Sequence, residues 1–131
     1  MRIEDESGWV ELRRKEGEEA FHVEASVGEF AGSNPNIFIA ASELRQFGSN
    51  LRQLEHDRRG EARLKAMSPD EFELAVRVVD AAGHVTVNGL IGRLKYSENA
   101  HHDLRFMYSF ELDPTGLPML VRDVERLLAA A

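Results

Sequence analysis

The side chains best suited to metal binding are the five histidines, His22, His56, His84, His101 and His102. His101, His102 and Asp103 are consecutive, but adjacent residues of a strand point to opposite faces and do not readily chelate one ion. His84 is expected at the far end of the same hairpin, about 12 residues away at ~3.3 Å each. We therefore expect a polar hairpin tip, with no metal site and no cofactor.

Catalytic motifs are equally weak. The absence of cysteine rules out thiolate nucleophiles, disulfides and sulfur-ligated zinc. His22-Val23-Glu24 matches H-x-E of zinc deaminases, but the P-C-x-x-C partner that this chemistry needs is missing. The glycines of residues 28–32 and 83–92 lack phosphate-loop spacing, and no G-x-S-x-G occurs. A facing carboxylate pair cannot be located from one sequence. We expect no catalytic residue and no enzyme.

Charge is the most informative property. The chain has 16 Lys and Arg against 23 Asp and Glu, a formal net charge of −7, which argues against nucleic-acid or anionic-lipid partners and favours a basic protein. Residues 1–20 contain 7 acids and 4 bases. Solubilising acids at turns are an ordinary alternative. The candidate partner-binding residues are Glu4, Asp5, Glu6, Glu16, Glu18 and Glu19.

A basic run consists of Arg58, Arg59, Arg63 and Lys65, in a stretch, residues 42–66, that has 6 bases and 4 acids. Neighbouring acids interrupt the run, and no aromatic residue lies between its bases. Cations near a helix C-terminus offset the helix dipole, so a structural role is the preferred interpretation.

The elements that position these residues follow from hydrophobic period. A length of 131 residues suits one domain, 1–131. The N-terminus lacks an apolar signal segment and no run of about 18 apolar residues occurs, so we expect a cytoplasmic protein without membrane contact. Alternation predicts strands over residues 62–66, 72–78, 84–96 and 102–112, which form a four-stranded meander.

In an antiparallel pair of strands, the residue numbers of opposed residues add up to a constant, and this sum fixes the expected register. We expect Leu64 opposite Leu74 and Val76 opposite Val87. Apolar residues in 84–96 change from odd to even positions. A bulge at Asn88-Gly89 would absorb this slip, and a two-residue turn is the competing interpretation. With the bulge, Leu94 lies opposite Leu104 and His84 opposite Asp113.

Upstream, the pattern predicts strands from Trp9 and over residues 21–27, and a short strand over 36–40. Ser42 is expected to cap a helix that ends near Gly60. A second helix is expected over residues 117–128, capped by Asp113 or Thr115. The expected fold class is α+β, an antiparallel sheet of about six or seven strands with both helices on one face.

The order of these segments resembles a family of small bacterial proteins, the WapI-type immunity proteins. The resemblance runs from about Trp9 to Leu128. It rests on Trp9-Val10-Glu11, Phe30-Ala31-Gly32, the Leu44-x-x-Phe47-x-x-x-Leu51-x-x-Leu54 helix, Gly60-Glu61-Ala62-x-Leu64, Gly83-His84-Val85-x-Val87, Leu104-x-Phe106 and Asp113-Pro114-Thr115-x-Leu117. It implies a non-catalytic binding protein that neutralises the toxic domain of a contact-delivered bacterial toxin.

Two function classes follow. The first is an immunity protein that binds a basic toxin domain stoichiometrically. The alternative is a small-molecule or metal-binding protein, or an enzyme, with a pocket between helix and sheet. A monomer or weak homodimer is expected, with self-association through an edge strand or through Val79 and Met107.

Overall fold

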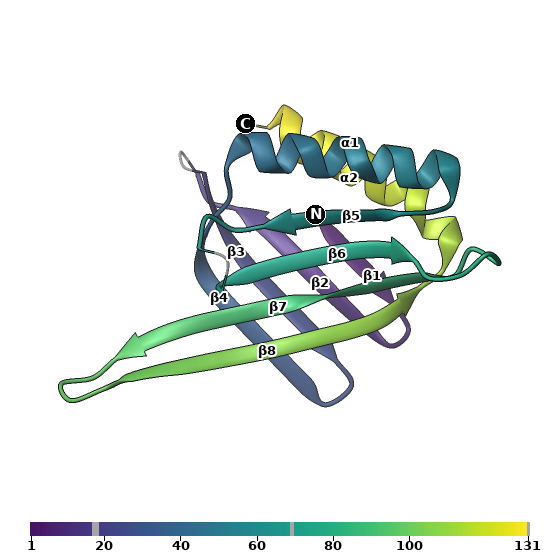
Figure 1. Ribbon diagram of the computed structural model, residues 1–131. Helices are drawn as coiled ribbons and strands as arrows, with labels where there is room; N and C mark the ends of the chain where they lie inside the picture. The colour runs from purple at the N-terminus through teal and green to yellow at the C-terminus, as the bar shows by residue number, and fades with distance from the viewer. Residues whose placement is uncertain (17–18, 69, 131) are drawn as a thin grey trace.

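The computed structural model describes residues 1–16, 19–68 and 70–130. The described part contains eight strands, two α-helices and one 3-10 turn (Figure 1). In chain order these are β1 (Arg2–Asp5), β2 (Gly8–Arg14), β3 (Ala20–Val27), β4 (Phe30–Phe38), α1 (Ala41–Asp57), β5 (Glu61–Lys65), β6 (Phe72–Val78), β7 (Val85–Tyr96), β8 (His101–Leu112), η1 (Pro114–Gly116) and α2 (Leu117–Ala129).

The strands form two antiparallel four-stranded sheets, β1-β2-β3-β4 and β5-β6-β7-β8. The α+β class is confirmed, with eight strands in two sheets instead of six or seven in one. The additional strand is β1, in which Ile3 is the only buried residue. Four residues with one apolar position give too little alternation to be detected in the sequence.

In the second sheet the expected meander is confirmed. Leu64 lies opposite Leu74 and Val76 opposite Val87. The expected bulge is wrong, because β7 and β8 keep one register from Val85↔Leu112 to Tyr96↔His101. Leu94 consequently lies opposite Asp103 and not Leu104. Within the body of the protein Ile91 keeps the odd phase, and Leu90 is buried on the opposite face of β7. The even-numbered Leu94 and Tyr96 lie in the outer part of the hairpin, where neither face is buried.

Strand β4 is longer than expected, since it begins at Phe30 and not at Asn36. Its sequence contains Pro35 and shows little alternation, which concealed it. Proline is tolerated because β4 is an edge strand, where a missing N–H costs no interior ladder bond. The register of β3 and β4 also shifts between Phe21 and Val23.

Both helices are confirmed, but Ser42 does not cap α1. The cap position is Ala40, without a side-chain hydrogen bond, so Ser42 lies inside the first turn. The helix ends on Arg58 in the left-handed conformation. Gly48 is buried where α1 meets α2, and a Cβ there would lie 3.1 Å from Val124 Cγ1. Neither Asp113 nor Thr115 caps α2, because its cap position is Gly116, without a side-chain hydrogen bond. Asp113 instead caps the preceding η1 by accepting a hydrogen bond from Thr115 N.

The core lies between the two sheets and beneath the helices. In Figure 1 the strands of β1–β4 run diagonally behind those of β5–β8, and the helices lie side by side above β5. Helix α1 packs against β5, and α2 packs against α1 and β1. The amide of Asn34, a buried residue of β4, donates to the Gly92 carbonyl of β7 at 2.8 Å and joins the sheets.

Candidate functional site

The candidate acids that the structure describes lie in two separate groups. Residues Glu4–Glu6 end β1 and form the β1–β2 turn, whereas Glu16 and Glu19 lie in the β2–β3 connection. Glu18 lies outside the described residues. The seven residues of β2 separate the two turns, a span of roughly 20 Å at ~3.3 Å per residue. The structure therefore divides the candidates between opposite ends of β2.

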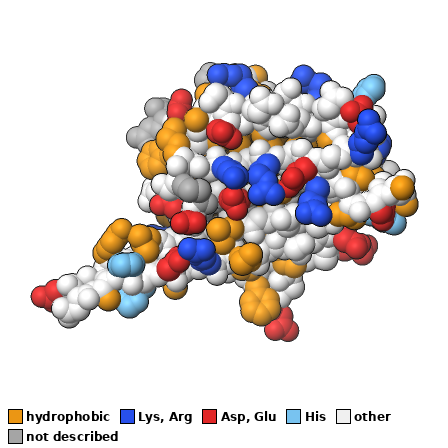
Figure 2. All heavy atoms as spheres, in the orientation of Figure 1, with side chains coloured by type: hydrophobic (Ala, Val, Ile, Leu, Met, Phe, Trp, Pro, Cys, Tyr) orange, Lys and Arg blue, Asp and Glu red, His pale blue; other side chains and the backbone are white. Residues whose placement is uncertain are grey.

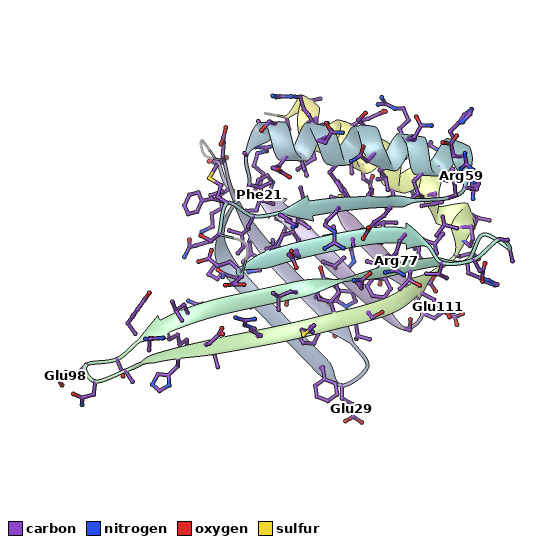
Figure 3. The ribbon with its side chains drawn as sticks, viewed as in Figure 1. Phe21, Glu29, Arg59, Arg77, Glu98 and Glu111 are labelled. Carbon is purple, nitrogen blue, oxygen red and sulfur yellow. The ribbon has the colours of Figure 1, made fainter. Side chains whose placement is uncertain are left out.

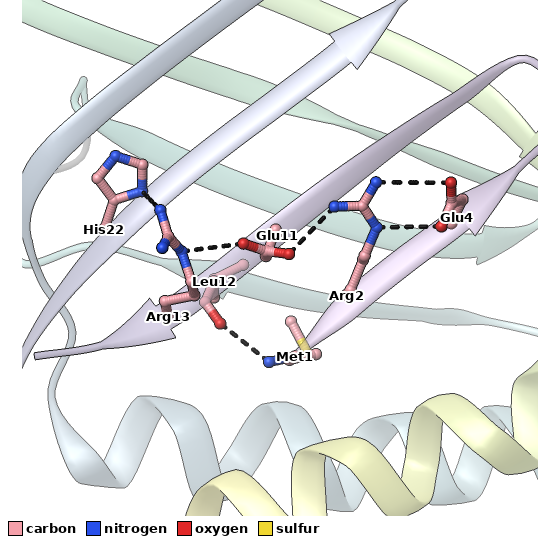
Figure 4. A network of polar contacts seen from close by, with 7 residues as sticks. All are labelled: Met1, Arg2, Glu4, Glu11, Leu12, Arg13 and His22. Carbon is pink, nitrogen blue, oxygen red and sulfur yellow. Dashed lines mark hydrogen bonds and ion pairs between the residues drawn. The ribbon is translucent and has the colours of Figure 1, made fainter.

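Glu4 is paired within the sheet. Arg2 lies between Glu4 and Glu11, with Nε 3.0 Å from Glu4 Oε2 and Nη1 3.1 Å from Glu11 Oε2 (Figure 4). Arg13 continues the chain of contacts from Glu11 to the His22 ring. These cations neutralise Glu4 and Glu11 locally, so the two acids add less to the field felt by a partner than their number suggests.

Asp5 and Glu6 lie where the two sheets meet at one end of the molecule. The Asp113 backbone N–H donates to Asp5 Oδ2 at 2.8 Å, which brings the β1–β2 turn to the end of β8. The cap to Thr115 holds the pKa of Asp113 below its ordinary value through backbone and side-chain hydrogen bonds. Glu111, exposed near the end of β8, precedes it by two residues. We call Asp5, Glu6, Glu111 and Asp113 the acidic end.

A second feature was not expected from the sequence. Every residue from 93 to 105 is exposed, and these residues form the outer half of the β7–β8 hairpin, which we call the arm. Figure 3 shows Glu98 at its tip, far from the helices. The arm has three bases, Arg93, Lys95 and Arg105, against two acids, Glu98 and Asp103. It is thus an extension with a charge opposite to that of the whole chain.

Exposed apolar side chains accompany the arm. On the arm, Tyr96 is 77% exposed and Leu104 50%. At the base of the arm, Met107 is 78% exposed and Phe30, the first residue of β4, is 71% exposed. Figure 2 shows such side chains on the arm and at the lower border of the sheet. A groove of about 430 Å³ follows the free edge of β8, lined by Val27 and Phe30 on one side and by β8 residues 105–109 on the other. An apolar edge of this kind is typical of a protein-interaction surface.

The sequence signal for the arm lies in Leu94 and Tyr96, whose even phase differs from that of Val85 and Val87. A strand whose apolar residues move from one face to the other is no longer packed on a one-sided core. A bulge explains the same slip in the sequence, and therefore the sequence alone does not distinguish the arm from a bulge.

The histidines are spread out as expected. His101 lies opposite Tyr96 on the arm, whereas His84 precedes Val85 at the other end of the hairpin. The side chain of His84 contacts Asp80 and not Asp113: His84 Nδ1 lies 2.6 Å from Asp80 Oδ2, which raises the pKa of His84. The predicted position of His84 opposite Asp113 agrees with the register, which reaches Val85↔Leu112. In the described ranges, no group of three or more His, Cys, Asp and Glu side chains is arranged to hold a metal ion.

The basic run lies among acids. Arg63 pairs with Glu61 of the same strand, β5, at 2.8 Å. Lys65 Nζ lies 3.7 Å from Glu73 Oε1 of the neighbouring strand, β6. Arg58 donates to the Glu55 carbonyl at the end of α1. These contacts agree with the structural interpretation of the run.

Two grooves lie between α2 and the start of the chain. One, of about 230 Å³, is lined by residues that include Ile3, Leu112 and Leu120, and the other, of about 340 Å³, by residues that include Met1 and Leu127. Pockets that enclose drug-sized ligands have about 300–1,000 Å³, so the first groove is below this range and the second is at its lower end. No helix among the described residues is long and apolar enough to cross a membrane.

Comparison with known proteins adds one finding. The model of the immunity protein WapI-like family matches residues 19–131, which include both helices and every strand from β3 to β8. Of the candidate acids, Glu4, Asp5, Glu6, Glu16 and Glu18 precede the matched segment. No curated protein and no solved structure matches the chain.

Proposed function

The chain belongs to the WapI-like immunity protein family, and we propose that it neutralises a bacterial toxin domain by binding it stoichiometrically, without catalysis. The family match over residues 19–131 carries this proposal. We place the protein in the cytoplasm of the cell that it protects. The toxin domain is expected next to its gene, as the C-terminal part of a large secreted protein.

We propose a basic toxin domain as the partner. A net charge of −7 on a chain of 131 residues gives a long-range field that accelerates encounter with a positive surface. Such steering acts on the association rate more than on the lifetime of the complex. Fast capture suits a protein that must reach a toxin before the toxin reaches its target.

The contact surface that we propose contains the six acids, with the greater weight on the acidic end. Asp5 and Glu6 add to Glu111 and Asp113 there, whereas Arg2 neutralises Glu4. Glu16 and Glu19 lie at the other end of β2. A toxin surface that contacts both turns would therefore have to extend over the length of this strand. The two turns are therefore separable by mutation.

The first experiment tests the function itself. The chain and the neighbouring toxin domain are produced together in a bacterial host, and growth is compared with that of cells producing the toxin domain alone. We expect restored growth and co-purification of the two proteins. Unrelieved toxicity at equal expression, or the absence of a complex, would contradict the proposal.

The second experiment tests the surface by association kinetics at several salt concentrations. Glu6→Gln/Glu111→Gln removes two exposed acids of the acidic end, and Glu16→Gln/Glu19→Gln removes two from the β2–β3 connection. Glu29→Gln/Glu43→Gln removes two exposed acids elsewhere as a matched control. We expect a several-fold slower association with a weaker salt dependence for the first variant. Equal slowing by the control would show that only net charge matters and would overturn the assignment to the acidic end.

A further inference from the structure

The free edge of β8 differs from the other sheet edges in the described part of the chain. Strand β1 has four residues and contacts α2, and β5 has five residues along α1. The fourth edge, β4, contains Pro35, and its register with β3 is shifted. Short strands, proline, irregular pairing and covering helices are the usual means by which proteins prevent edge pairing.

Strand β8 has none of these protections. It is 12 residues long, contains no proline and pairs with β7 in one unbroken register. Its residues from His101 to Arg105 are exposed, and the groove beside Phe30 runs along its continuation. The edge is therefore accessible to an added strand, and a strand lying there would cover Met107, which is 78% exposed.

The charges of β8 indicate which strand fits. Asp103 and Arg105 lie on the same face of the strand, with Arg105 Nε 2.8 Å from Asp103 Oδ2. When two copies of β8 pair antiparallel about Leu104, each Asp103 lies directly opposite the other copy's Arg105. Two within-strand pairs and two cross-strand pairs then form a square of alternating charge, and directly opposed opposite charges stabilise a sheet.

Neighbouring registers are unfavourable. A shift of two residues in one direction places Asp103 opposite Asp103 of the second copy. The same shift in the other direction places Arg105 opposite Arg105 of the second copy. Like charges directly opposed are destabilising. In the favoured register Leu104 also meets Leu104 of the second copy, and this residue is 50% exposed in the single chain.

We propose that a second copy of this chain binds along β8, in a two-fold antiparallel pairing centred on Leu104. The two second sheets then form one continuous sheet, and the arms overlap between the two bodies. The paired segment, residues 101–107 of each copy, is short, so the dimer is weak and dissociates on dilution. The pairing is independent of the toxin-binding function.

Charge exchange on β8, followed by sedimentation velocity at protein concentrations from about 5 μM to about 1 mM, tests this pairing. Asp103→Arg places arginines opposite each other, and Arg105→Asp places aspartates opposite each other. We expect each variant to raise the dissociation constant at least about tenfold. An equimolar mixture of the two variants restores opposite charges at both positions, so the mixture is expected to form a heterodimer as tight as the wild-type dimer.

The double variant Asp103→Arg/Arg105→Asp also keeps the charges complementary and is expected to dimerise, while Glu43→Arg on α1 is the control for a changed net charge. All substitutions are at exposed positions, and circular dichroism confirms folding. A wild-type chain that stays monomeric at about 1 mM, single variants that dimerise like the wild type, or a mixture that stays monomeric would each overturn the proposal.

Discussion

Tyr108 and the Glu73 carbonyl occupy the space that a side chain in place of Gly89 would need. A Cβ on Gly89 would lie 2.0 Å from the Glu73 carbonyl oxygen and 2.5 Å from the Tyr108 hydroxyl oxygen. That hydroxyl donates to the same carbonyl at 2.9 Å, and burial raises the pKa of Tyr108, so it remains a donor at any ordinary pH. The glycine is thus required by close packing within a regular strand, not by a bulge.

We therefore expect Gly89→Ala to reduce the free energy of unfolding by roughly 1–3 kcal/mol, the usual cost of overpacking. Urea denaturation measures this change. The matched control is Asn88→Ala in the same strand, where a side chain is already accommodated. A Gly89→Ala protein as stable as the wild type would show that Tyr108 does not pack over this position.

His84 and Asp80 form an exposed pair whose effect is on titration. Hydrogen bonding to Asp80 raises the pKa of His84 above 6.5, and the same contact lowers the pKa of Asp80 below 3.8. The imidazole's contribution to stability is complete below pH 6.5 and is lost as the pH rises through the raised pKa. The carboxylate's contribution is present above pH 3.8 and is lost as the pH falls through the lowered pKa.

Asp80→Asn is expected to return the pKa of His84 toward 6.5, as followed by NMR titration of the imidazole. Because both side chains are exposed, the change in stability should be small. His84→Ala is likewise expected to leave the fold nearly unchanged. An unaltered His84 titration in Asp80→Asn would refute the pairing.

At the scale of elements, period and register arguments predicted the second sheet and both helices. Leu64, Leu74 and Val76 alternate over a one-sided core, and each pairs as the constant sums require. Strand β1 and the first half of β4 could not be predicted in this way, because their short or irregular sequences show no alternation. Prediction of the arm would require knowledge of where the core ends, and this depends on how one sheet packs on the other.

The candidate site was less predictable from the sequence than the fold. Glu4–Glu6 are close in sequence to Glu16 and Glu19, yet β2 lies between the two groups. The contact between Asp5 and Asp113 joins residues 108 positions apart, and no local sequence pattern predicts it. Burial and period are local signals, whereas a surface is assembled from distant segments.

A buried amide contributes to the contact between the two sheets. Asn34 donates to the Gly92 carbonyl and accepts a hydrogen bond from Asn36 N at 3.0 Å. Asn34→Ala leaves both groups without this partner, so we expect a loss of about 1–3 kcal/mol in the free energy of unfolding, measured in urea. Ser33→Ala, at the exposed neighbouring position, is the control and should be near neutral. A neutral Asn34→Ala would mean that this contact does not help to hold the sheets together.

At the scale of the whole molecule, the sheets and helices contribute to one hydrophobic cluster. We propose that the chain unfolds as one domain, in a single cooperative transition. Trp9, the only tryptophan, reports on the first sheet by fluorescence, and circular dichroism at 222 nm reports mainly on the helices. Coincident urea transitions are expected, and two separate midpoints would contradict the single domain.

We propose two binding surfaces on this molecule: the acidic end for a basic toxin domain, and the edge of β8 for a second copy of the chain. The two surfaces do not share residues, so charge exchange at Asp103 and Arg105 is expected to leave toxin neutralisation intact. Loss of neutralisation in these variants would show that the arm also contacts the toxin.

The most direct test of the account is a titration of the toxin domain's activity with the purified chain, at toxin concentrations well above the dissociation constant. Stoichiometric binding predicts a linear fall in activity that ends at about one chain per toxin domain, with calorimetry giving the same ratio. Activity that persists beyond equivalence would contradict toxin binding. Complete inactivation by a small fraction of an equivalent would contradict a non-catalytic mechanism.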